Sequence, residues 1–112
     1  MSTLRIVVAN EPRSYRDALA VAFRCLRTDF EIITAEPADL SAEVARVQPR
    51  LVICSQLTSA VEEQVPAWIV LPADRTAPAV ISVGGEHRVL AEAHLQDLVS
   101  ITDQLTRPQT QP

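Results

Sequence analysis

Short apolar runs alternate with segments of helical periodicity over the first 71 residues, and this alternation constrains the fold more than any other feature. The strand-like runs are residues 4–9, 30–34, 51–54 and 67–71. Between them, apolar residues recur at three- and four-residue steps over 15–26 and 40–47, and a third, short helix is predicted from Ser59. Strands separated by helices lie parallel in one sheet that helices cover on both faces. The sequence therefore predicts an α/β domain.

The alternation ends after residue 71. Residues 72–78 are too few for a crossover helix, so we predict that a strand at 79–83 runs antiparallel to its neighbour. Gly84-Gly85 supplies the positive φ angles of a hairpin turn, and 88–91 follows as the return strand. The place of 79–83 in the strand order stays open. A last helix is expected, with these residues on its apolar face: Leu95, Leu98, Thr102 and Leu105.

Length and charge narrow the class of protein. The 112 residues suffice for one core, so we expect one domain over 1–106 and a disordered, proline-containing tail at 107–112. The net charge of −4 argues against nucleic-acid binding. No apolar run is long enough for a membrane span or a signal peptide, so a cytoplasmic protein is expected. Cys25 and Cys54 are predicted to be buried, reduced thiols.

Several segments carry a family resemblance. The run RIVVANE at 5–11, followed by YRDAL at 15–19, resembles the opening of response-regulator receiver domains. QPRLVICS at 48–55 is similar to the third strand of that family, and 89–98 to its last strand and the start of its last helix. The resemblance covers residues 4–71 and returns at about residue 88.

The resemblance implies a fold. It is the flavodoxin-like, three-layer α/β/α architecture of receiver domains, with a mainly parallel sheet. In this chain the fourth helix of the family would be replaced by the strand and hairpin at 79–91, within a single receiver-like domain over 1–106.

The resemblance also implies a degenerate phosphorylation site. Receivers hold Mg²⁺ with two acidic residues, phosphorylate an aspartate after the third strand, and use a hydroxyl and a lysine in the active state. The corresponding positions here are Asn10, Glu11, Ser55 and Pro72, and the chain has no lysine. Mg²⁺ usually takes one or two carboxylates, and a serine without an adjacent base is a weak nucleophile. We therefore expect no catalytic residue, no metal ion and no cofactor.

Two features suggest a partner surface. Arg13, Arg16, Arg24 and Arg27 project within about a quarter-turn of one another, opposite the apolar face of their helix. This row is either a dock for an acidic partner or a solvated helix face. Ile101 lies off the predicted core stripe of the last helix and would add apolar surface. The hairpin at 79–91 has no lysine to guard a sheet edge, which favours a two-fold homodimer.

These observations lead to two functional hypotheses. The first is a phosphorylation-independent pseudo-receiver that acts through protein–protein interaction in bacterial signalling or transcriptional regulation, with a protein partner that the sequence does not identify. The second is a small-molecule-sensing domain that uses the crevice at the carboxyl ends of the strands, near Glu11 and Ser55. An enzyme is not expected, because no set of nucleophile, base and oxyanion donors can be assembled.

Overall fold

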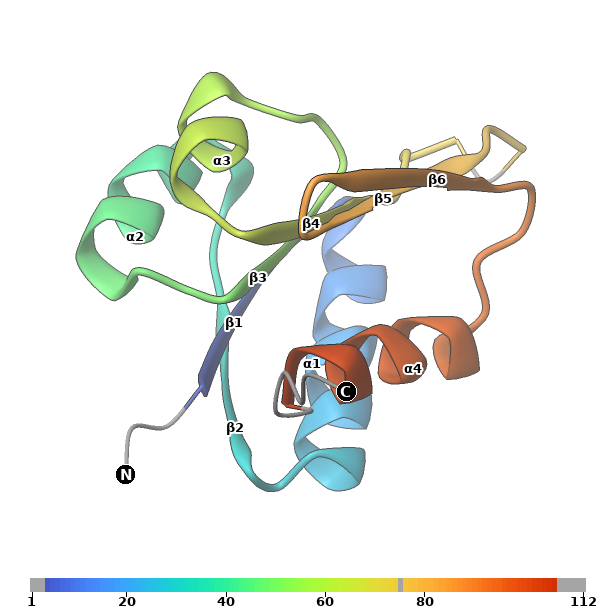
Figure 1. The fold of residues 1–112 in the computed structure, drawn as a ribbon, viewed down its shortest axis with the longest axis horizontal. Helices are drawn as coiled ribbons and strands as arrows, with labels where there is room; N and C mark the ends of the chain where they lie inside the picture. The colour runs from blue at the N-terminus through green and yellow to red at the C-terminus, as the bar shows by residue number, and fades with distance from the viewer. Residues whose placement is uncertain (1–3, 75, 107–112) are drawn as a thin grey trace, which may run out of the picture.

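A computed structural model of the chain describes residues 4–74 and 76–106. Six strands form one sheet in the order β2-β1-β3-β4-β5-β6 (Figure 1). Their bounds are β1 Leu4–Ala9, β2 Phe30–Thr34, β3 Leu51–Cys54, β4 Ala67–Val70, β5 Ala79–Val83 and β6 Glu86–Leu90. The first four strands pair in parallel, and β5 and β6 complete the sheet as antiparallel strands.

Helices cover both faces of the sheet. They are α1 Arg13–Leu26, the short 3-10 helix η1 Pro37–Asp39, α2 Leu40–Val47, α3 Ser59–Gln64 and α4 Leu95–Thr106. On one face, Phe23 of α1 and Leu98 of α4 pack with strand residues such as Ile53. On the other face, Val44 of α2 and Val61 of α3 pack against a second group of strand residues. Within the described ranges, no helix is long and apolar enough to cross a membrane.

The predicted flavodoxin-like architecture with a mainly parallel sheet is wrong. A flavodoxin-like sheet continues with parallel strands, whereas two of the five strand pairings here are antiparallel. The physical reason lies in residues 72–78, which cannot hold a crossover helix, so the chain returns directly beside β4. The predicted antiparallel direction of 79–83 is confirmed, and β5 lies between β4 and β6. Gly84 and Gly85 form the turn with φ angles of 59° and 87°.

Two predictions about side-chain burial are also wrong. Ile101, expected outside the core, is 2% exposed and packs in the same cluster as Leu98. Leu26, expected on the apolar face of α1, is 55% exposed. The reason for the first difference is that α4 packs against both the sheet and α1, so its buried face is wider than one stripe. The predicted tail at 107–112 lies outside the described residues.

Candidate functional site

Ser55, which the sequence resemblance aligns with the phosphoacceptor of receivers, is held by the main chain of two neighbouring strand ends. Its hydroxyl accepts a hydrogen bond from the Glu11 N–H at 2.7 Å and donates one to the Leu71 carbonyl at 2.8 Å. These contacts join the segments that follow β1, β3 and β4. Ser55 therefore ties the carboxyl ends of three strands together, which is a structural role.

The crevice around Ser55 is small. It has a volume of about 50 Å³, and its walls include Glu11, Leu40 and Cys54. Sites for small molecules usually have volumes of roughly 300–1,000 Å³, and one water takes up about 30 Å³ of liquid. The crevice of the sensor hypothesis thus has room for a water molecule or two.

The other two residues of the expected degenerate site do not join Glu11 and Ser55 as a group of side chains. Asn10 is fully buried, and its side-chain nitrogen and oxygen have no hydrogen-bond partner among the described residues. Pro72 lines a different and larger cavity. In the described part of the chain, no three histidine, cysteine or acidic side chains gather where they could hold a metal ion.

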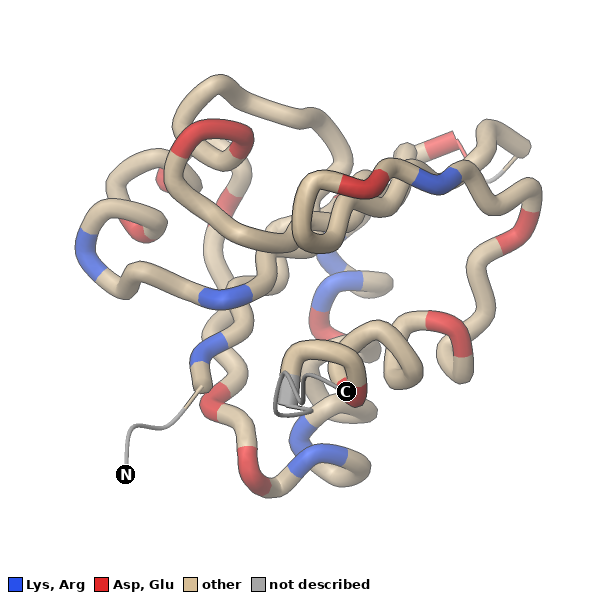
Figure 2. The backbone as a smooth tube through the Cα atoms, viewed as in Figure 1, with Lys and Arg blue, Asp and Glu red and all other residues tan. Residues whose placement is uncertain are grey.

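The predicted row of four arginines does not exist as one exposed surface. The Arg16 side chain is only 7% exposed, and its guanidinium donates to the carbonyls of Asn10 and Ala35 and to Glu36. Acidic and basic positions are interspersed along the backbone in Figure 2.

The remaining arginines of the row also have separate surroundings. Arg27 is 13% exposed, pairs with Asp29 and Asp103, and lies over the Phe30 ring. Arg24 donates to the Ile32 carbonyl. Arg13 fits the prediction, since its side chain is 78% exposed. Arg16 buries its long stem because carbonyls at two strand ends accept hydrogen bonds from its guanidinium, and helical periodicity does not reveal this.

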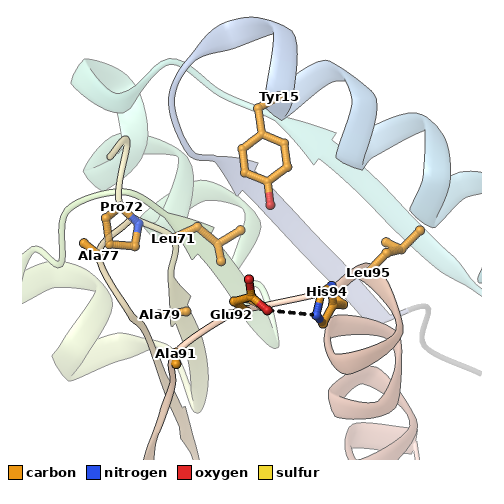
Figure 3. A pocket seen from close by; sticks show the side chains of 10 residues that line it. Tyr15, Leu71, Pro72, Ala77, Ala79, Ala91, Glu92, His94 and Leu95 are labelled. Atoms are coloured by element: carbon orange, nitrogen blue, oxygen red, sulfur yellow. Dashed lines mark ion pairs between the residues drawn. The ribbon is translucent and has the colours of Figure 1, made fainter. Parts of the chain in front are cut away.

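A larger cavity of about 400 Å³ lies beside α1, at the end of β4. Tyr15 of α1 points into it from one side, and Glu92 and His94, from the loop before α4, line another side (Figure 3). The Glu92 carboxylate lies 3.7 Å from Nε2 of His94. Sequence reasoning missed this cavity, because its walls come from segments near residues 15, 72, 79 and 92 that only the fold brings together.

The two cysteines differ in exposure, so the prediction of two buried thiols is wrong for one of them. Cys25 is exposed and Cys54 is buried. Burial raises the pKa of the Cys54 thiol to about 12, so this group stays protonated at neutral pH. The thiolate is the reactive form. We expect iodoacetamide to add once to the native chain and twice after denaturation, as measured by intact mass. Two additions to the native chain would contradict the burial of Cys54.

Comparison with protein-family models found no match for this chain, and neither did comparison with curated proteins. The interpretation of its function therefore rests on its own residues and their geometry.

Proposed function

We propose that this chain is a protein-interaction domain that works without phosphotransfer, and that its contact surface is the free edge of β6. The proposed partner is a second copy of the chain. The resemblance of its sequence to receivers is the reason to place this role in bacterial signalling or transcriptional regulation. The observation that carries the proposal is the solvent-facing β6 strand, which forms one edge of the sheet.

The strand β6 is unusually exposed. The four residues 86–89 are solvent-exposed, and Val89 is 65% exposed although it is apolar. An edge strand offers unpaired N–H and C=O groups that pair readily with another strand. In folded proteins such an edge is normally covered by a helix or loop or pairs with a further strand.

The register of the hairpin tells which main-chain groups face outward. The two-residue turn at Gly84-Gly85 places Val83 opposite Glu86, and flanking residues of such turns form a hydrogen-bonded pair. Hydrogen-bonded and non-hydrogen-bonded pairs then alternate along the two strands. His87 and Val89 therefore fall in non-hydrogen-bonded pairs, and their N–H and C=O groups point away from β5 toward the free edge.

The opposite edge strand of the sheet, β2, has a main-chain group that a side chain already occupies. On β2 the Ile32 carbonyl accepts a hydrogen bond from Arg24. No described side chain hydrogen-bonds to the main chain of β6. This contrast favours β6 over β2 as the edge that meets a partner.

Charge selects a register for two copies of β6. In a two-fold antiparallel pair centred on His87, Glu86 of each copy lies opposite Arg88 of the other. His87 of one copy then lies opposite His87 of the other. Their outward N–H and C=O groups can form the hydrogen-bonded pair that an antiparallel ladder requires at this position. A pair centred on Arg88 would instead place two arginines opposite each other, which is unfavourable. The structure of the hairpin thus supports the arrangement centred on His87, which pairs Glu86 with Arg88.

The register can be tested by charge exchange. The Arg88→Glu variant places like charges opposite each other twice in each dimer, so we expect its dissociation constant to rise about tenfold. The double variant Glu86→Arg with Arg88→Glu should restore dimerisation. Arg13→Glu, which changes an exposed arginine on α1, is the matched control and should leave association unchanged. Sedimentation equilibrium measures all four proteins, and a double variant as weak as Arg88→Glu would overturn this register.

The absence of phosphotransfer is a separate expectation. Because the Ser55 hydroxyl is engaged by Glu11 and Leu71, we expect acetyl phosphate with Mg²⁺ to leave the chain unmodified. Intact-mass analysis before and after treatment is the measurement. A stoichiometric phosphate adduct on Ser55 would show that the proposed role is wrong in this respect.

A further inference from the structure

We propose that the cavity beside Tyr15 binds a small organic ammonium compound, with the charged nitrogen at Glu92 and an apolar or aromatic body against the cavity wall. This proposal is independent of the pairing of β6. It rests on the size of the cavity, on the chemistry of its lining and on where the fold places it.

Size and place are those of a ligand site. The cavity volume of about 400 Å³ lies within the roughly 300–1,000 Å³ typical of small-molecule sites. It begins at Leu71 and Pro72, directly after the carboxyl end of β4, and ligands of open α/β sheets bind outside the carboxyl ends of strands. It is about eight times larger than the crevice at Ser55.

Small side chains keep the cavity open. Four alanines line it, at positions 77, 79, 91 and 93, together with Leu71 and Pro72. A methyl group fills little of the space between the loop before β5 and the loop before α4. These side chains give part of the lining a hydrocarbon surface, against which a compact hydrocarbon or aromatic body can pack.

The polar lining selects the charge of the ligand. Glu92 is the one acidic residue among the described residues that line the cavity, and its carboxylate lies beside the His94 ring. Tyr15 presents its ring and hydroxyl to the same space (Figure 3). A carboxylate together with an aromatic ring suits an ammonium group, which gains an ion pair and a cation–π contact. The net charge of −4 also favours a cation over an anion.

The affinity should be modest. The side chains of Glu92 and His94 are 81% and 71% exposed, so water screens their charges. We therefore expect dissociation constants in the millimolar range for simple probes.

Three probes of similar size separate charge from shape. Phenethylamine carries the ammonium, 3-phenylpropanol is neutral and 3-phenylpropanoate is an anion. In a nitrogen–proton NMR titration of the full chain, phenethylamine should shift the amide signals around residues 91–95 and bind at least about threefold more tightly than either other probe. Equal binding of the three probes, tighter binding of the anion, or no binding by any of them would overturn the proposal.

Variants locate the binding. Glu92→Gln should weaken phenethylamine binding about threefold, and Ala91→Phe, at an exposed position on the rim, should abolish it by filling the cavity. Glu63→Gln, an exposed glutamate of α3, is the matched control and should bind as the unchanged chain does. Unaltered binding by Ala91→Phe would place the probe elsewhere and overturn the proposal.

A lysine side chain offers the same ammonium on a different carrier. The probe for this source is lysine with an acetyl group on its α-nitrogen and a methylamide at its carboxyl end, which keeps the side-chain ammonium free. It is measured in the same titration. Weaker binding than phenethylamine supports a small-molecule ligand, whereas tighter binding would assign the cavity to a lysine of another protein and overturn the proposal as stated.

Discussion

Replacing Arg16 with methionine is expected to lower the free energy of unfolding by about 3 kcal/mol, because buried carbonyls lose their donor. The Arg16 guanidinium donates to the carbonyl of Asn10 at 3.2 Å and to that of Ala35 at 3.1 Å. Asn10 and Ala35 are both buried, and they directly follow β1 and β2. Arg16 thus holds the ends of two strands against the first turns of α1.

Arg13 provides the matched control for this prediction. Its side chain is 78% exposed, and its Nε lies 3.8 Å from the Asp17 carboxylate. Arg13→Met should change stability by less than about 0.5 kcal/mol, as exposed substitutions usually do. Urea denaturation of both variants gives the two free energies. Equal losses in the free energy of unfolding for Arg16→Met and Arg13→Met would contradict the buried, hydrogen-bonded position of Arg16.

Replacing Ile101 with alanine is expected to cost about 3 kcal/mol, since the side chain is buried in the core between α1, α4 and the sheet. Leu26→Ala is the matched control, because Leu26 is 55% exposed and should lose less than about 1 kcal/mol. Helical periodicity alone predicts the larger loss for Leu26→Ala, because it places Leu26 on an apolar helix face and Ile101 off the core stripe. Denaturant unfolding of the two variants decides between the structure and that prediction, and a larger loss for Leu26→Ala would contradict the structure.

The strands could be predicted from sequence because the strands of a sheet that is covered on both faces are rich in apolar residues, as β3 is at every position. The runs 4–9, 30–34 and 51–54 coincide with β1, β2 and β3. The antiparallel return at β5 could also be predicted, since the short connection from β4 and the pair Gly84-Gly85 are local features. The flavodoxin-like, mainly parallel sheet was expected from the resemblance and not from these local signals, and the antiparallel pairings of β5 and β6 overturn it.

The rest depends on contacts between distant segments. Ile101 is buried because α4 has two neighbours, whereas the pattern of one helix reveals one face. Arg16 is buried because the carbonyls of Asn10 and Ala35 need a donor, and no local motif encodes that requirement. Of the expected site, Glu11 and Ser55 do meet, but Pro72 lines the separate cavity with Tyr15. The meeting of Glu11 with Ser55 follows from their places after β1 and β3, whereas a single sequence carries no signal that brings Pro72 to Tyr15.

The mass of the unchanged protein in solution tests the proposed pairing of two chains through β6 most directly. A two-fold dimer is predicted from the main-chain groups of His87 and Val89, which point toward the free edge, and from the opposite charges of Glu86 and Arg88. Sedimentation equilibrium at micromolar concentration should give twice the 12.3 kDa mass of the chain. A mass of 12.3 kDa across the whole concentration range would contradict the account.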